Sequence, residues 1–109
     1  METREELIRK ITAYTGFAIK SGGVVFGLDG IKDMRATVRV ILGDCSLSEK
    51  SRKEIVFIAE KKRVPVFFLE GLGDIVKRVN VKVISIKNRE LAIQILESCQ
   101  KLSEVKEHE

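Results

Sequence analysis

The sequence predicts an α/β fold, a single three-layer α/β/α sandwich with a small mixed central sheet. Two observations support this prediction. Apolar residues alternate along the chain between a helical period and short runs that are apolar almost throughout. The runs VRVIL (38–42) and VPVFFL (64–69) suggest burial on both faces, which is typical of strands covered on each side by helices. With 109 residues, the chain is long enough for one hydrophobic core and is expected to form one domain.

The N-terminal half is expected to form a helix, a short strand, a short helix and a buried strand. Thr3 and Glu6 form a capping-box pattern at the start of the first helix, and the sequence Ser-Gly-Gly at 21–23 ends it. The apolar stripe of this helix is Leu7, Ile8, Ile11, Tyr14 and Phe17 or Ala18. The other elements expected here are a strand over 24–26, a helix over 27–34 with Ile31 and Met34 facing inward, and a strand over 38–42.

The C-terminal half continues the alternation. A capping-box pattern from Ser46 to Glu49 opens a helix that is expected to end at Lys62. Pro65 stands near the start of the strand 64–69, where a hydrogen-bond donor can be spared. The elements expected next are a short helix over 71–79, a strand over 81–86 and a helix capped by Asn88 that runs through Leu96. The domain is expected to span 1–102, followed by a frayed, charged tail over 103–109.

Charge and side-chain composition limit the classes of function. The chain carries 20 Lys and Arg against 16 Asp and Glu, a net charge of +4, which favours an anionic partner, although a solvated charged surface gives the same balance. His108 is the only histidine, so a Ser-His or Cys-His catalytic pair is not expected, and zinc-ligand spacing is missing. The glycine motifs of dinucleotide- and nucleotide-binding loops do not occur. We therefore expect a protein that is not an enzyme and holds no cofactor or metal.

Three aspartates and two cysteines are the remaining candidates for a reactive site. Asp29, Asp33 and Asp44 would suit a magnesium cluster, but caps, turns or surface acids explain them more simply. Cys45 and Cys99 are expected to be reduced and mostly buried, although the position of Cys45 leaves a redox-sensing role open. The charged N-terminus lacks an apolar signal core, and no apolar run is long enough to span a bilayer. We expect a cytoplasmic protein that is monomeric when free.

The most informative stretch runs from Gly16 to Asp44. It places glycine-opened turns and a helix start next to cations, an arrangement suited to a phosphate-bearing partner. The residues of this candidate phosphate-tracking surface are Lys20, Gly22, Gly23, Gly27, Lys32 and Arg35. The competing interpretation is structural, with a tight turn at 22–23 and a helix start at Gly27.

Four motifs stand in an order and spacing that is moderately specific. They are GFAIKSGGVVFG (16–27), VILGD (40–44), VP (64–65) and LGDIV (72–76). Together they resemble the ribosomal-protein family called seven-Ae and thirty-e, whose members bind kink-turn RNA, and the small bacterial ribosome-associated members look most similar. The resemblance covers the chain from about Leu7 to Leu96. It implies an RNA-binding α/β/α domain that associates with the ribosome and does not catalyse a reaction.

The resemblance implies that RNA is held at the start of the helix after the first short strand. In the family this helix begins with a glycine, a small polar residue, Asn or Lys, and Glu, with a Lys one turn later, and these groups contact sheared G·A pairs. Here Gly27 matches the glycine, and Leu28, Asp29 and Gly30 stand at the next three positions. Lys32 matches the later lysine if one residue is deleted. Asp29 departs from the pattern, because a carboxylate cannot donate a hydrogen bond and repels phosphate.

The family's second contact is an apolar loop before the penultimate helix, which packs on a flipped-out nucleotide. The resemblance places Leu69 and Leu72 in that role, while the nearby cations at 77–78 fit either an RNA contact or the negative end of a helix. The expected partner is therefore structured RNA. An alternative stays open, a protein–protein interaction or regulatory module that kept the fold and lost kink-turn binding, because the residues at 28–30 depart from the family's pattern.

Overall fold

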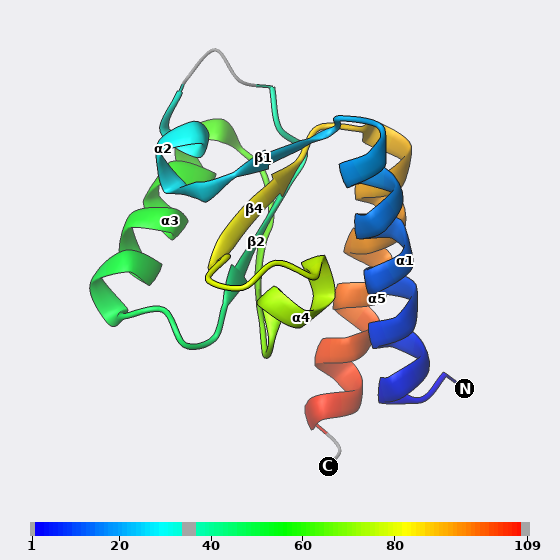
Figure 1. Ribbon diagram of the computed structural model, residues 1–109. Coiled ribbons are helices and arrows are strands. Elements are labelled where there is room, and N and C mark those ends of the chain that lie inside the picture. The colour runs from blue at the N-terminus through cyan, green and yellow to red at the C-terminus, as the bar shows by residue number, and fades with distance from the viewer. Residues whose placement is uncertain (1, 34–36, 108–109) are drawn as a thin grey trace.

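Helices and strands alternate strictly in the computed structural model, which describes residues 2–33 and 37–107 (Figure 1). The helices are α1 (Arg4–Lys20), α2 (Gly27–Lys32), α3 (Glu49–Lys62), α4 (Leu72–Val76) and α5 (Arg89–Glu107). The strands are β1 (Val24–Phe26), β2 (Val40–Asp44), β3 (Val66–Leu69) and β4 (Val83–Ile86). The order of elements is the one that the apolar periodicity predicts.

The strands form one mixed sheet in the order β1-β4-β2-β3. β4 pairs antiparallel with β1 and β2, whereas β2 pairs parallel with β3. Ile86 therefore lies opposite Val24 and Val40, and Ile84 lies opposite Phe26 and Leu42. Because β4 runs against its neighbours, it starts at the edge where β1, β2 and β3 end. We call this edge the C-terminal end of the sheet and the opposite edge its N-terminal end.

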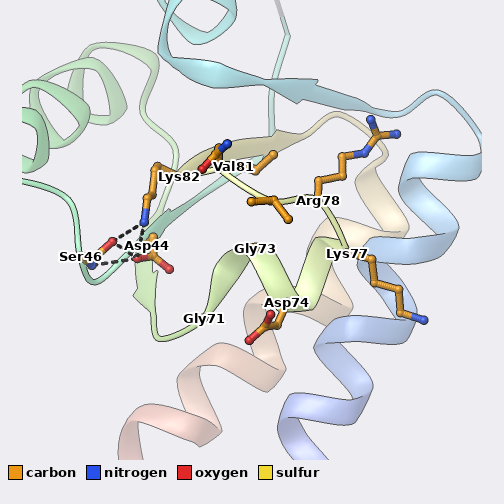
Figure 2. Close-up of a pocket in the computed structure, with 11 residues that line it drawn as sticks. Asp44, Ser46, Gly71, Gly73, Asp74, Lys77, Arg78, Val81 and Lys82 are labelled. Carbon is orange, nitrogen blue, oxygen red and sulfur yellow. Dashed lines mark hydrogen bonds and ion pairs between the residues drawn. The ribbon is translucent and has the colours of Figure 1, made fainter.

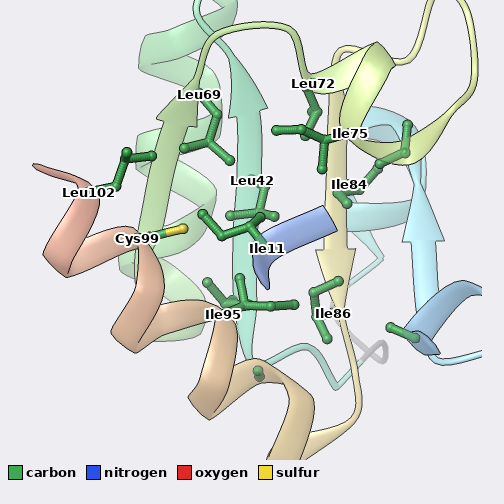
Figure 3. Packing of buried hydrophobic residues seen from close by; sticks show 14 of the residues in the cluster. Ile11, Leu42, Leu69, Leu72, Ile75, Ile84, Ile86, Ile95, Cys99 and Leu102 are labelled. Atoms are coloured by element: carbon green, nitrogen blue, oxygen red, sulfur yellow. The ribbon is translucent and has the colours of Figure 1, made fainter. Parts of the chain in front are cut away.

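Two helical layers cover the two faces of the sheet, which confirms the predicted three-layer α/β/α sandwich. α1 and α5 pack along each other on one face together with α4, and α2 and α3 lie on the other face (Figure 1). Successive strand residues point to opposite faces, so Leu42 and Ile84 pack towards α1 and α5 while Ile41 and Val83 pack towards α2 and α3. Figure 3 shows the first of these two clusters.

The ends of α1 follow local signals in the sequence. Thr3 Oγ1 accepts the Glu6 N–H at 3.2 Å, which confirms the predicted cap. At the other end, Gly22 has a φ of +74°, and the N–H groups of Gly22 and Gly23 donate to carbonyls of the last turn at 3.1 and 2.8 Å. This is the Schellman pattern of a helix C-cap. The two glycines therefore form the tight turn that ends α1, which agrees with the structural interpretation of Gly22 and Gly23.

Some boundaries differ from the expected ones. β2 spans Val40–Asp44 rather than 38–42, because its pairing with β3 and β4 continues past Leu42. α3 does not open with a capping box from Ser46, since the hydroxyl of Ser46 bonds a carboxylate instead. Ser48 is the N-cap, and its side chain accepts the Ser51 N–H at 3.2 Å.

The C-terminal tail is the largest difference. The prediction of a frayed tail from residue 103 is wrong over 103–107, because α5 continues to Glu107. The apolar stripe of this helix extends past Leu96, and Leu102 is buried in the same cluster as Ile95. Lys101 Nζ lies 3.2 Å from Oε1 of Glu2, so an ion pair links α5 to the segment that precedes α1.

Both cysteines are free thiols. Cys99 lies inside the cluster of Figure 3, and burial raises the pKa of its thiol to about 12. It is therefore protonated and unreactive at neutral pH. Cys45 is half-buried directly after β2.

Gly30 allows α2 to pack closely on β1, because a Cβ at this position would stand 2.4 Å from Cγ1 of Val25. We expect Gly30→Ala to lower the free energy of unfolding by about 1–3 kcal/mol in urea denaturation. Gly16→Ala is the matched control, since it lies inside α1 with open space around an added Cβ, and it should raise stability by about 0.5–1 kcal/mol. Equal stability of Gly30→Ala and the wild type would show that α2 is not held by this contact.

Candidate functional site

Two hollows open at the C-terminal end of the sheet, on either side of residues 77–82, which connect α4 to β4. We call this segment the 77–82 loop. The first hollow, of about 650 Å³, lies between the loop, α4 and the end of β2 (Figure 2). The second, of about 430 Å³, lies between the loop, the start of α2 and the first turns of α3. Asn80, Val81 and Lys82 line both hollows.

A buried carboxylate organises the wall of the first hollow. Asp44, the last residue of β2, accepts the Leu72 N–H at 2.8 Å and the Ser46 N–H at 2.9 Å, as well as the Ser46 hydroxyl. Lys82 Nζ lies 3.7 Å from the same carboxylate and donates to Ser46 Oγ at 2.7 Å (Figure 2). The hydroxyl hydrogen bond is the largest of the effects that lower the pKa of Asp44 to about 2. Asp44 therefore caps α4 and anchors the residue at which the 77–82 loop ends.

The backbone of the 77–82 loop is held in a sparsely populated conformation. Lys77 and Asn80 both have left-handed backbone, with φ of +57° and +71°. The Arg78 N–H donates to the Gly73 carbonyl at 2.9 Å, which fixes the turn out of α4. Val79, between the two left-handed residues, is 89% exposed. Left-handed non-glycine residues cost roughly 1–3 kcal/mol each and gather at binding sites, which makes this loop a candidate contact surface.

Arg78 joins the loop to the end of β1. Its guanidinium lies 4.6 Å from the centre of the Phe26 ring, a cation–π stack in which the ring is 37% exposed. Phe26 directly precedes Gly27, which opens α2 with a φ of +81° and has open space where a Cβ would stand. The surface thus combines a planar cation, an aromatic edge and accessible main chain.

The charges around the loop have both signs. Lys77 and Arg78 are exposed and form no ion pair within the described part of the chain, whereas Asp74 and Asp29 add two exposed carboxylates. Among the residues that the structure describes, no group of His, Cys, Asp and Glu could hold a metal ion. In the same residues no helix is long and apolar enough to cross a membrane.

The cations and the apolar groups around the 77–82 loop suit a ligand that carries both phosphates and flat apolar groups.

The structure separates the residues that the sequence predicts for the site. Gly27 and Leu28 line the second hollow, and Asp29 is exposed on the same short helix. The predicted residues at the other end of β1 are Lys20, Gly22 and Gly23. They flank the N-terminal end of the sheet, so the fold does not unite them with Gly27 in one surface.

Of the other two predicted cations, one is engaged in an ion pair and one lies outside the described residues. Lys32 is exposed on α2, but its Nζ lies 2.7 Å from Oε1 of Glu54 on α3. The hydrogen bond to Glu54 raises the pKa of Lys32 and connects the two helices. Arg35 lies outside the described residues, as does Met34.

The surface role expected for Leu69 and Leu72 is wrong. Their side chains are 5% and 0% exposed and belong to the cluster of Figure 3. Leu69 ends β3 on the face that α1 and α5 cover, and the Asp44 carboxylate holds Leu72, at the start of α4, against the end of β2. Val79, in the loop that follows α4, is the more exposed of the apolar residues Phe26 and Val79 near this edge. The sequence contains a signal for it, since Val79 stands among polar residues in KRVN (77–80) and fits neither the helix nor the strand beside it.

The chain was compared with known proteins. No family model matches it, and no curated protein matches it either. A protein of unknown function from Bacillus halodurans has a similar structure, with a TM-score of 0.77 and 14% identity over 84% of this chain and 97% of that one. The 15.5kD RNA binding protein of Giardia lamblia has a TM-score of 0.68 and 18% identity over 96% and 99%. The chain therefore shares its α/β/α fold with an RNA-binding protein.

Asp44→Asn tests the carboxylate that organises this edge. The folded pKa of about 2 lies below the roughly 3.9 of an unfolded aspartate. The ionised group therefore stabilises the fold fully above about pH 4, and this stabilisation is lost as the pH falls towards 2. We expect the substitution to lower the free energy of unfolding by about 1–2 kcal/mol at pH 7 and by progressively less between pH 4 and pH 2. A difference that stays constant over this range in urea denaturation would show that the charge is not the cause.

Proposed function

We propose that this protein binds structured RNA, without catalysis, through the start of α2 and the 77–82 loop. The observation that carries the proposal is the Arg78–Phe26 stack with the exposed Val79 beside it. RNA-binding proteins recognise splayed bases by stacking them on aromatic rings, guanidinium planes and apolar side chains. A loop held by left-handed residues presents such groups with little flexibility to lose on binding.

Phosphate contacts complete the proposed interface. Lys77 and Arg78 are exposed cations at the rim of the first hollow, and Lys82 keeps about half of its side chain exposed beside Asp44. The main chain at Gly27 is open, which lets an RNA backbone approach closely. Likeness to the Giardia lamblia RNA binding protein supports RNA as the partner.

The finer proposal is that the RNA contains a kink-turn and that the protein associates with the ribosome. It rests on the motifs at 16–27, 40–44, 64–65 and 72–76. Asp29 and the Lys32–Glu54 ion pair weigh against the family's contacts at α2, since one group repels phosphate and the other is already engaged. This observation favours a second candidate function, an interaction with a protein through the same edge of the sheet.

Substitutions in the 77–82 loop test the proposal. We expect Arg78→Ala and Val79→Ser each to weaken binding of a kink-turn RNA by about tenfold, because each removes a stacking surface worth roughly 1–3 kcal/mol. Filter binding or calorimetry at two salt concentrations measures the effect. Lys101→Ala is the control, since it removes an exposed cation from α5 and should leave the affinity within about twofold.

The outcomes separate the two candidate functions. Binding of wild-type protein that weakens steeply with salt and depends on Arg78 supports the RNA interface. If the wild type binds neither a kink-turn RNA nor a plain duplex at low salt, the protein-interaction function takes its place.

Asp29→Asn tests the kink-turn proposal separately. An amide at this position can donate a hydrogen bond to a base edge and no longer repels phosphate. We expect the affinity for a kink-turn RNA to rise by about tenfold, because the variant gains roughly one hydrogen bond and loses the carboxylate charge. The affinity for a plain duplex should rise less. Equal gains for both RNAs in a competition assay would show that α2 acts only through its charge.

A further inference from the structure

A second group of cations gathers at the N-terminal end of the sheet, away from the 77–82 loop. We call it the distal basic patch, and its members are Lys20, Arg39, Lys87 and Arg89. All four side chains are exposed. They come from the last turn of α1, the residue before β2, the residue after β4 and the first residue of α5, so the fold assembles the patch from distant parts of the sequence.

Backbone hydrogen bonds hold three of these segments together. The Arg39 N–H donates to the Ile86 carbonyl at 2.8 Å, and the Lys87 N–H donates to the Gly23 carbonyl at 2.7 Å. The observed register between β2 and β4 ends where Val40 lies opposite Ile86. The Arg39 N–H bonds the carbonyl of that same Ile86, and Lys87 follows Ile86 directly, so both cations lie at this end of β4. Gly23, which bonds Lys87 through its carbonyl, adds no side chain that covers it.

The patch lacks internal neutralisation. Within the described part of the chain, none of its four members forms an ion pair, although Glu90 follows directly in the first turn of α5. Four cations at one end of the sheet create a positive potential there, and a bound polyanion would neutralise it.

We propose that the distal basic patch binds the phosphodiester backbone of a second RNA segment, so that the protein bridges two parts of an RNA. The choice of RNA rests on the proposed function of the 77–82 loop. β4 begins beside that loop and ends beside the patch, so its four residues, about 13 Å long, separate the two surfaces. The two surfaces therefore lie at opposite ends of the sheet, and we expect a different RNA segment to occupy each of them.

The patch differs from the 77–82 loop in what it offers a ligand. Its members are Lys and Arg alone, with no aromatic or apolar group among them, so it contacts phosphates and does not read bases. Binding there is accordingly independent of sequence and steeply dependent on salt.

A capture experiment tests the bridge. Kink-turn RNA is immobilised and saturated with protein, and a labelled plain RNA duplex is then passed over it at low salt. We expect the wild type to retain the duplex. The double variant Arg39→Ala, Lys87→Ala keeps both main-chain bonds and should bind the immobilised RNA as the wild type does. It should retain about tenfold less duplex, and the logarithmic salt slope of duplex binding should fall by about 1.5–2.

Lys10→Ala, Lys101→Ala is the matched control, because it removes two exposed cations from the surface of α1 and α5. It should retain duplex as the wild type does. Equal retention of duplex by the Arg39 and Lys87 double variant, or no retention by wild type bound to the immobilised RNA, overturns the role of the distal basic patch. Neither result affects the proposed function of the 77–82 loop. Preferential capture of anionic vesicles or of an acidic protein overturns RNA as the partner of the patch.

Failure of the proposed function looks different. A wild type that does not bind kink-turn RNA through Arg78 but binds plain duplex, with affinity lost on substitution of Arg39 and Lys87, overturns the role of the 77–82 loop and retains the distal basic patch.

Discussion

The carboxylate of Asp44 is the interaction on which the functional edge of this fold depends. It receives the Leu72 N–H, the Ser46 N–H and the Ser46 hydroxyl, and Lys82 lies beside it. Three segments that are distant in sequence thereby meet at the end of β2. A buried carboxylate with this many donors remains ionised, because each donor favours the charged form and lowers its pKa. Without it, the start of α4 and the end of the 77–82 loop would have no common anchor.

The central position of β4 decides which residues can act together. It is the strand that runs against the other three, so its start meets the ends of β1 and β2 and its end meets their beginnings. The helical layers on both faces leave these two ends as the accessible parts of the sheet (Figure 1). Loops at one end carry Arg78 and Val79, and connections at the other carry Arg39 and Lys87. This topology places the two surfaces that we propose for RNA recognition at opposite ends of the sheet.

Structural contacts hold α2 against its neighbours. Gly30 packs against Val25 at a distance that admits no side chain, and Lys32 is paired with Glu54. The interface that we propose therefore depends more on the 77–82 loop, whose left-handed residues are Lys77, the C-cap of α4, and Asn80. The fold resembles that of an RNA-binding protein at 18% identity, a level at which a scaffold can persist while its contact residues are replaced.

The sequence by itself determined the local elements and the fold class. Apolar periodicity placed every helix and strand in order, and the cap at Thr3 and the glycine pair at 22–23 marked both ends of α1, because these signals act within a few residues. Only the tertiary structure decided which residues face solvent. Leu69 and Leu72 are as apolar as Val79, but Leu69 lies on the covered face of β3, and the distant contact with Asp44 holds Leu72 against the sheet. Strand order, which no local pattern encodes, also brought Arg39 and Lys87 to the same end of β4.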